Sequence, residues 1–472
     1  MLTTLAAPAF AATWRIEDGN ITVKAGDTEG TNKVSQGTII DKVDTNTIIT
    51  NSDKATASSN TVTIDAEDHK VEVTLDNVNI KADSGSALTS KGDVTLTLKG
   101  DNHLTGGNGD TYGGDGITSS GSLTISGGTV TANGDDGGRG ISSSGSVTIS
   151  GGSTVTANGG SGTISGGDGI WSGGGVTISG GSTVTANGGN GGSLVGGDGI
   201  RSGGGLTVSD GTVTAKGGNG DSKDGYGGDG IRSGGVVTIS GNTVNAAGGY
   251  GGKVGGYGIC SFDRVAISGG TVKSNGGSGN LSGGNGIISY DIDLSGSLEL
   301  TAKAGSPNGK ALSRAGKELD LNTIKDKLGP GAKVTVTDAN GKVNQVSIPR
   351  PVEPEESSSS SDGGSAAPSA PASPLPGLTV TDKDGQRISY TSTQSGNTLT
   401  VCVGRFTASF RISLATLRQL RAEGIDTITF QTILCSTTLS VDELLAMGGE
   451  DTEVVLTHHI RSSTLTVGGK AV

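Results

Sequence analysis

Short segments in which apolar and polar residues alternate recur in a fixed order along most of the chain. Within residues 154–158, Val155 and Ala157 alternate with hydroxyl and amide residues, and residues 146–150 follow the same pattern. Successive side chains of a β-strand point to opposite faces, so each segment predicts a short strand with one apolar face. The period of two runs through every element of the repeat, which predicts strands and not helices.

Each repeat starts with an isoleucine that follows a Gly-Asp-Gly-like motif. These anchors are Ile117, Ile141, Ile170, Ile200, Ile231, Ile259 and Ile287. A repeat of this length cannot bury its own apolar face, which predicts a solenoid. We expect an all-β, right-handed parallel β-helix, in which each strand pairs with its equivalent one coil away. A β-sandwich of hairpins is the alternative, because periodicity does not fix strand partners.

The sequence divides into four parts. Residues 1–11 resemble the end of a signal peptide, with a small-x-small cleavage site at Ala9-Phe10-Ala11. Residues 12–348 are expected to form the β-helix with N- and C-terminal capping segments, because open solenoid ends would pair with other chains. Residues 349–377 are a Pro/Ser-rich linker.

Residues 378–472 predict a small α+β domain. A helix is expected from Leu414 to Ala422, with Ser413 as N-cap and Gly424 just past its end. Two similar stretches, residues 412–428 and 439–454, predict two β-α-β-like halves. Cys402 and Cys435 lie in this part and could pair, which would leave Cys260 as a free thiol.

The 88 glycines cluster between the predicted strands. After Asn158 and Asn187 we expect corners with positive φ, which glycine adopts most easily. Two interpretations of the asparagines stay open, either a stacked ladder or the starts of turns. The asparagines at equivalent positions are Asn133, Asn158, Asn187 and Asn275.

Composition narrows the possible functions. Aromatic residues make up 3% and hydrophobic residues 31% of the chain, and the net charge is −12. Nucleic acid is not an expected partner, because it is bound through clustered cations and no Lys/Arg block occurs. No apolar run approaches the length of a membrane span. Together with the signal-like start, this predicts a protein that is secreted or held at a cell surface, of unknown oligomeric state.

Four aspartates hold equivalent positions just before the anchors, and Arg139 takes the slot after the first of them. Equivalent residues of parallel coils lie about 4.8 Å apart, so stacked carboxylates repel unless a cation, a proton or another partner relieves them. Calcium suits oxygen ligands in flexible geometry and is the predicted cofactor. In the alternative, aspartate only shapes the turn beside glycine. The predicted metal ligands are Asp115, Asp168, Asp198 and Asp229.

The residues just after the anchors are expected to point outward. In this column Trp171 precedes Arg201 and Arg232, while Tyr226 and Tyr257 lie in nearby loops. An aromatic plate beside cationic donors is a common way to bind sugars. These five residues are the predicted carbohydrate-binding residues. An exposed tryptophan without a function is the alternative.

Catalysis is not expected, because the repeat shows no convergent acid and base. A β-helix lyase or glycoside hydrolase remains the alternative. A minor alternative is an ice-binding solenoid, because outward Thr-x-Thr pairs recur. These pairs are Thr129/Thr131, Thr154/Thr156, Thr183/Thr185 and Thr212/Thr214.

The coils before the regular repeat carry a resemblance. Residues 61–65, 73–80, 86–88 and 94–102 resemble the opening coils of secreted, clostridial-type bacterial proteins with β-helical carbohydrate-binding domains. The resemblance covers roughly residues 45–312. It implies a right-handed parallel β-helix, binding of polysaccharide, and calcium as a cofactor that could be present, in a protein secreted by a bacterium or held at its surface. The polysaccharide could be acidic, because an anionic sugar could pair with Arg201 and Arg232. No binding residue of that family maps onto a position here, and an adhesin-like role is equally compatible.

Overall fold

The computed structural model describes two compact units of the chain, Met1–Pro354 and Glu355–Val472. The described residues are 12–109, 113–349, 377–382, 386–388, 390–395, 397–403, 405, 407–432, 436–449, 452–458 and 463–471. The predicted signal segment, residues 1–11, lies outside them, as does nearly all of the predicted linker.

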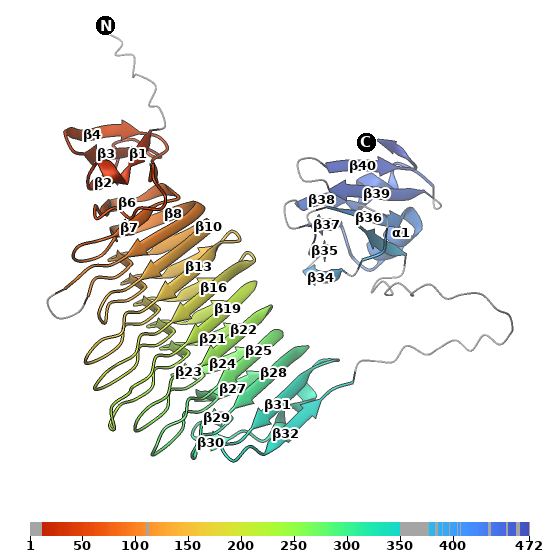
Figure 1. Cartoon of the computed structure of the whole chain (residues 1–472). Helices are drawn as coiled ribbons and strands as arrows, with labels where there is room; N and C mark the ends of the chain where they lie inside the picture. Colours follow the sequence, from red (N-terminus) through yellow and green to blue (C-terminus); the bar gives the residue numbers. More distant parts are fainter. Residues whose placement is uncertain are drawn as a thin grey trace, which may run out of the picture. The chain divides into compact units, whose positions relative to one another are not determined.

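The first unit is a parallel β-helix of about 12 turns, which confirms the predicted fold class (Figure 1). Three columns of strands run along it. The anchors begin the first column: β9 (Ile117–Ser119), β11 (Ile141–Ser143), β14 (Ile170–Ser172), β17 (Ile200–Ser202), β20 (Ile231–Ser233), β23 (Ile259–Ser261), β26 (Ile287–Ser289) and β29 (Leu312–Arg314).

The second and third columns share the long strand β10 (Leu123–Asn133). The second continues through β12 (Val147–Ser150), β15 (Val176–Ile178), β18 (Leu206–Val208), β21 (Val237–Ile239), β24 (Arg264–Ile267) and β27 (Asp291–Leu294). The third continues through β13 (Thr154–Asn158), β16 (Ser182–Asn187), β19 (Gly211–Lys216), β22 (Thr243–Ala247), β25 (Gly270–Asn275), β28 (Leu298–Lys303) and β31 (Lys333–Thr337).

Irregular coils precede the repeat. They are built from β1 (Thr13–Arg15), η1 (Ile16–Asp18), β5 (Ile48–Thr50), β6 (Val62–Asp76), β7 (Asn79–Lys81) and β8 (Leu88–Thr105). Strands β6 and β8 pair in parallel with each other, and β8 pairs with β9 and β10, so the columns are continuous from the first coils onward.

Register follows the apolar pattern. Ile141 pairs with Ile117 and Ile170, and Ile200 with Ile170 and Ile231, and all of these side chains are fully buried. Each strand therefore pairs in parallel with its equivalent one coil away, which excludes the sandwich of hairpins. The predicted outward threonines stack in the same register, as in Thr154↔Thr183↔Thr212.

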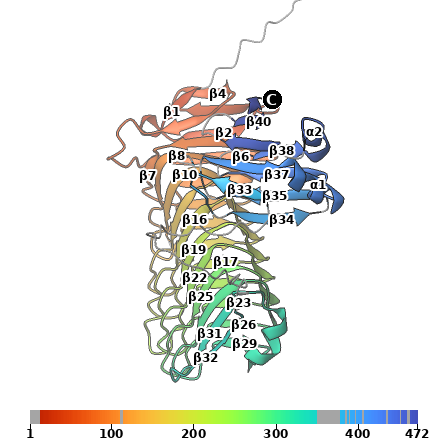
Figure 2. The same ribbon diagram turned by 90° about the vertical axis from the view of Figure 1, so that its right-hand side faces the viewer.

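Antiparallel strands close both ends of the stack (Figure 2). At the N-terminal end, β2 (Ile21–Ala25), β3 (Asn32–Gln36) and β4 (Ile39–Asp44) form a small meander. At the other end β32 (Val343–Ser347) pairs with β31, and β30 (Lys317–Glu318) pairs with β29. The 3₁₀ helix η2 (Leu321–Lys327) lies between β30 and β31 in this end of the unit.

The asparagine ladder is confirmed for three members. Asn158 donates to Asn133 Oδ1 and Asn187 donates to Asn158 Oδ1, both at 2.8 Å. Asn275 holds an equivalent position but lies beyond Lys216 and Ala247, which interrupt the column. The side-chain amides thus hydrogen-bond to one another across successive coils, in addition to any role in starting a turn.

The expected positive φ at the loop glycines is wrong. None of the glycines after Asn158 and Asn187 has positive φ. They lack side chains because the loops of adjacent coils approach each other too closely: a Cβ at Gly189 would lie 2.0 Å from the carbonyl oxygen of Gly160. A zigzag of hydrogen bonds, from Gly189 N to Gly167 O and from Gly197 N to Gly189 O, joins the loops along the stack. We call this row of loop glycines the glycine seam.

The second unit contains two sheets. One is formed by β33 (Leu378–Thr381), β36 (Ala408–Ser413), β39 (Glu453–His458), β40 (Ser463–Val467) and β41 (Lys470–Ala471). The other is formed by β34 (Thr391–Ser395), β35 (Thr398–Cys402), β37 (Thr427–Gln431) and β38 (Ser436–Ser440).

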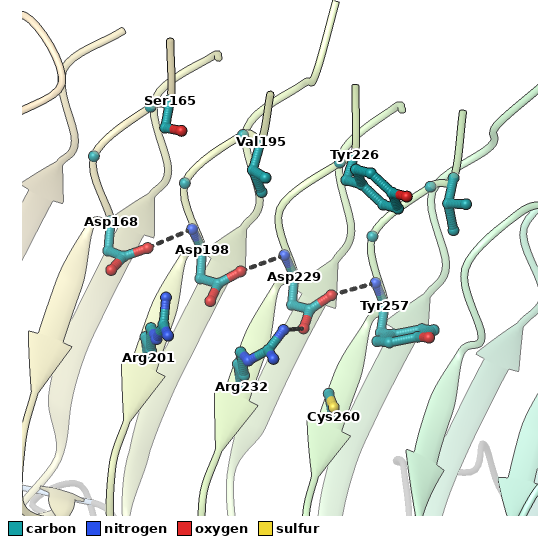
Figure 3. A pocket seen from close by; sticks show the side chains of 18 of the residues that line it. Ser165, Asp168, Val195, Asp198, Arg201, Tyr226, Asp229, Arg232, Tyr257 and Cys260 are labelled. Atoms are coloured by element: carbon teal, nitrogen blue, oxygen red, sulfur yellow. Dashed lines mark hydrogen bonds and ion pairs between the residues drawn. The ribbon is translucent and has the colours of Figure 1, made fainter. Parts of the chain in front are cut away.

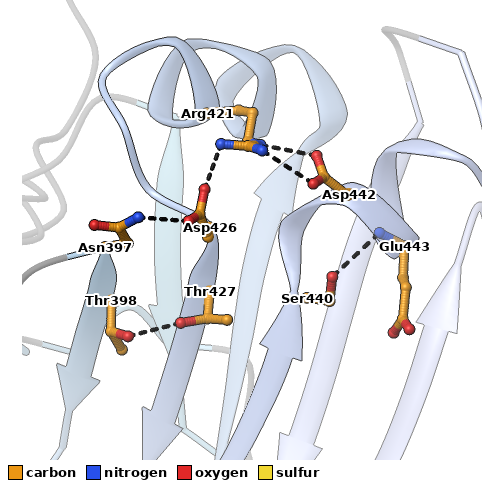
Figure 4. A network of polar contacts seen from close by, with 8 residues as sticks. All are labelled: Asn397, Thr398, Arg421, Asp426, Thr427, Ser440, Asp442 and Glu443. Carbon is orange, nitrogen blue, oxygen red and sulfur yellow. Dashed lines mark hydrogen bonds and ion pairs between the residues drawn. The ribbon is translucent and has the colours of Figure 1, made fainter.

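Both predicted β-α-β halves of this unit are present. Helix α1 (Leu414–Ala422) joins β36 to β37, and α2 (Val441–Leu445) joins β38 to β39, so each half crosses from one sheet to the other. Ser413 and Ser440 cap the two helices. Arg421 at the end of α1 makes two contacts with Asp442 on α2, at 2.8 and 3.1 Å, and also pairs with Asp426 (Figure 4).

The predicted pairing of Cys402 with Cys435 falls partly outside the described part of the chain. Cys435 is not described, so its pairing with Cys402 stays a prediction, whereas Cys260 is a free, buried thiol, as expected. His458 is fully buried, and its ring nitrogens hydrogen-bond with the hydroxyls of Thr432 and Thr437. Among the helices that are described, none combines the length and apolar character needed to cross a membrane.

Candidate functional site

An open pocket of about 960 Å³ runs along one corner of the β-helix and is lined by residues from Gly113 to Gly316. We call it the corner groove. Its floor is the column of residues just before the anchors, and its two walls are the column just after the anchors and the returning ends of the loops (Figure 3). The floor holds Asp168, Asp198, Asp229 and Tyr257; one wall holds Arg201, Arg232, Cys260 and Ile288; the other holds Ser165, Val195, Tyr226 and Val254.

The loop wall is more ordered than its composition suggests. Ser165, Val195, Tyr226 and Val254 pair in parallel from coil to coil as isolated bridges. The long insertion between Lys216 and Asp229 is therefore part of a stacked ladder that presents side chains to the groove. Because the glycine seam holds neighbouring loops together, this wall has a defined spacing.

Each aspartate of the floor is bonded to the next coil. Asp168 Oδ1 accepts the backbone N–H of Asp198, Asp198 Oδ1 accepts that of Asp229, and Asp229 Oδ1 accepts that of Tyr257, all at 2.7 Å (Figure 3). Asp115 does the same for Arg139. The column therefore satisfies backbone donors between coils, a structural role close to the turn-shaping alternative.

Burial makes these carboxylates unusual acids. Asp168, Asp198 and Asp229 are all less than 8% exposed. Burial raises the pKa of Asp229 to about 6, against the lowering effects of the Tyr257 N–H and Arg232. The pKa of Asp198 is raised well above its usual value by burial and by the charges of Asp229 and Asp168 on either side. The pKa of Asp168 is raised by burial as well.

The arginines are paired unevenly. Arg139 Nε lies 3.6 Å from Asp168 Oδ2, and Arg232 donates to Asp229 Oδ2 at 3.3 Å. Arg201, between them, has no ion pair or hydrogen bond to any residue that the structure describes. The central carboxylate of the floor is thus the one without a paired arginine.

Trp171 lies beside Arg201 in the wall column, as predicted, but it is half-buried and does not line the groove. The guanidinium of Arg139 stacks over its ring at 4.5 Å from the centroid. One face of the predicted sugar plate is therefore covered by a cation–π contact. The column is also less uniformly outward than expected, because Ser142 and Cys260 are buried.

Aromatic side chains that are more exposed than Trp171 line the groove, although Lys253 and Arg232 lie over the rings of Tyr226 and Phe262, as Arg139 does over Trp171. Tyr226 and Phe262 are about half exposed and Tyr290 is 70% exposed, and Tyr257 contributes a half-buried ring. Three of the six tyrosines of this aromatic-poor chain thus line one groove. Tyr250, in a neighbouring loop, does not line it.

Calcium stays a prediction. No group of three or more His, Cys, Asp or Glu side chains placed to hold a metal ion occurs among the described residues. One oxygen of each predicted ligand already accepts a backbone hydrogen bond. A cation at the floor would therefore bind to the outer oxygens, where it would compete with Arg139 at Asp168 and with Arg232 at Asp229, and would take its other ligands from water or from a bound molecule.

Sequence reasoning did not identify Val195, Val254, Phe262 and Tyr290 as groove residues. Val195 and Val254 are equivalent to Tyr226 in the loop ladder, but loop lengths differ, so their equivalence could not be read without the bridges. Phe262 and Tyr290 each follow an anchor by three residues, which is a signal that the sequence did contain.

No protein-family model, curated protein or solved structure matches this chain.

Proposed function

We propose that the β-helix binds a polysaccharide along the corner groove without catalysing a reaction on it. The observation that carries this proposal is the gathering of exposed aromatic rings beside charged groups in a chain that has few aromatic residues elsewhere. Sugars stack their apolar ring faces on aromatic side chains and hydrogen-bond their hydroxyls to polar groups, and a groove lined by both suits them.

The shape of the site favours a polymer. The groove extends across successive coils, and each coil contributes one floor residue and one residue to each wall. A longer oligosaccharide would contact more coils, so affinity should rise with chain length. A small molecule would use only a fraction of the lining.

The arrangement of the carboxylates supports binding over hydrolysis. Glycoside hydrolases place two carboxyl groups on either side of the scissile bond. Asp198 and Asp229 instead share one column of the floor, and each has one oxygen bonded to the backbone. A hydrolase or lyase is a second candidate, favoured by the raised pKa of Asp229 within a groove.

Location and cofactor belong to the same proposal. Export from a bacterial cell or display at its surface is supported by the signal-like residues 1–11. Calcium bound at the outer oxygens of the Asp floor is supported by the repulsion between stacked carboxylates. An adhesin-like role, in which a protein is the partner, is tested by the same experiment.

The test is a glycan array with the full chain, with and without chelator, followed by titration of oligosaccharides of increasing length. We expect binding that strengthens with length. Tyr226→Ala should weaken it about three- to tenfold through the loss of one stacking ring. Tyr250→Ala is the matched control, because Tyr250 is exposed to the same extent, 41% against 42%, but does not line the groove.

If Tyr226→Ala and Tyr250→Ala weaken binding equally, the corner groove is not the binding site. Absence of binding to any glycan would favour a protein partner. New reducing ends released from a bound glycan would favour the hydrolase or lyase.

A further inference from the structure

Asp198 and Arg201 are charged residues of the corner groove that have hydrogen-bonding atoms without a partner among the described residues. Arg139 and Arg232 pair with Asp168 and Asp229. The exposed guanidinium of Arg201 has no such partner among the residues described. An arginine side chain has five N–H donors, which match the two oxygens of a carboxylate.

Asp198 is 6% exposed, yet one of its oxygens is unused. Oδ1 accepts the backbone N–H of Asp229, whereas Oδ2 has no hydrogen-bond or ion-pair partner in the described part of the chain. The residue lines the groove, so this oxygen is accessible to a ligand there. Removing a carboxyl oxygen from water without giving it a hydrogen-bond partner costs free energy. A ligand that donates a hydrogen bond to this oxygen offsets that cost.

The two groups lie on the same coil, three residues apart, with Asp198 on the floor and Arg201 on the adjoining wall (Figure 3). A ligand unit that satisfies both must carry an anion and, next to it, a hydrogen-bonding group. A sugar hydroxyl both donates and accepts, so it can bond to a carboxyl group in either protonation state.

We propose that Asp198 and Arg201 form a subsite for a uronic acid unit, in which Arg201 binds the sugar carboxylate and Asp198 Oδ2 hydrogen-bonds a ring hydroxyl. This subsite deepens the proposed polysaccharide binding and rests on it. The neighbouring positions of the wall column are the half-buried Trp171 and Arg232, and Arg232 is already held by Asp229 and stacked on Phe262 at 5.1 Å. The groove therefore selects an acidic unit at one coil, while aromatic rings contact the units beyond it.

The experiment compares oligogalacturonides with the same oligosaccharides after reduction of their carboxyl groups to alcohols, by titration calorimetry on the full chain in chelator. The acidic form should bind at least about tenfold more tightly, the effect of one charged hydrogen-bonded contact. Arg201→Gln should abolish this preference. Arg264→Gln should keep it, because Arg264 is exposed on β24 and does not line the groove.

Asp198→Asn tests the second contact. Its side-chain oxygen can still accept the Asp229 N–H, so the fold should persist, which an unchanged circular dichroism spectrum would verify. Because the hydroxyl is present in both ligands, this variant should weaken the acidic and the reduced form by a similar factor.

Equal affinity of the acidic and reduced forms for the wild-type chain would overturn the uronate subsite and leave polysaccharide binding intact. Binding of the acidic form only when calcium is added would replace the direct contact at Asp198 by a metal bridge and also overturn it. Tight binding of a sulfated neutral oligosaccharide, lost in Arg201→Gln, would overturn the preference for carboxylate. Failure of both forms and of all array glycans to bind would refute the proposed function itself.

Discussion

Replacement of Gly218 by alanine tests whether the glycine seam holds the coils together. A Cβ at this position would lie 1.9 Å from the carbonyl oxygen of Gly189 in the preceding coil. Because a Cβ that lies closer than 3.0 Å to another heavy atom forces a shift, the two loops must move apart by more than about 1 Å. Gly218 also donates to Gly197 O at 2.8 Å and accepts from Gly228 N at 2.9 Å, so the movement strains both hydrogen bonds.

The expected loss of stability follows from these contacts. Overpacking costs about 1–3 kcal/mol, and each lost backbone hydrogen bond costs about 0.5–1.5 kcal/mol. With both hydrogen bonds of Gly218 lost, these terms predict that Gly218→Ala lowers the free energy of unfolding by about 2–6 kcal/mol. A folded domain typically has about 5–15 kcal/mol in total, so the change is large.

Thermal and urea unfolding followed by circular dichroism measure the effect. The matched control is Gly175→Ala in the same β-helix, where the nearest atom to the added Cβ is Gly205 O at 3.2 Å and φ is not positive. The control should change stability by less than about 1 kcal/mol, because alanine also restricts the unfolded chain. Equal destabilisation by the two variants would refute the close-packed seam.

Other predictions concern the core and the floor of the groove. Ile200→Asp, which buries a charge at a fully buried anchor, should lower the melting temperature far more than Thr207→Asp on the outer face, and equal shifts would contradict the observed register. The pKa of Asp229 is raised from 3.8 in the unfolded chain to about 6 by burial, so its contribution to stability is present below pH ~4 and lost as the pH rises through 6. Urea unfolding between pH 4 and 8 should therefore show a free energy of unfolding that falls as the pH rises, with a smaller fall in Asp198→Asn. A free energy of unfolding that rises with pH would contradict the raised pKa of these buried carboxylates. Chelation should lower the melting temperature if calcium binds the floor, and Asp198→Asn should reduce that effect; a melting temperature independent of millimolar calcium would leave only the backbone role of the column.

The apolar pattern was sufficient to predict the fold, because it constrains every coil in the same way. Ile170 and Ile200 occupy the same inward position, and a register shift of one residue would expose the whole column. The same reasoning located the helix at Leu414–Ala422, where Ser413 and Gly424 mark its two ends. In these places local preference and tertiary packing agree.

The glycines were misinterpreted because the sequence shows that a side chain is absent but not why. A glycine such as Gly189 could serve a turn with positive φ or a close approach of two backbones, and only the position of the neighbouring loop distinguishes them. The aspartates posed a similar problem. Their spacing placed them in one column, but the hydrogen bond from Asp229 N to Asp198 Oδ1 depends on backbone geometry that no spacing reveals.

The lining of the groove shows how the β-helix separates stability from recognition. The inward column keeps isoleucine from Ile141 to Ile287, because any other size would disturb the coils above and below. The wall column instead varies along the stack, from Trp171 through two arginines and Cys260 to Ile288, because most of its side chains pack less tightly against one another than the inward isoleucines do. A groove with a charged end and an aromatic end cannot present the same surface at each step. A polymer bound in the groove would therefore be held in one register and one direction, as a ligand with distinct units requires. The threonine columns on the other strands of the coil are uniform, so a polymer bound to them could take any register along the stack.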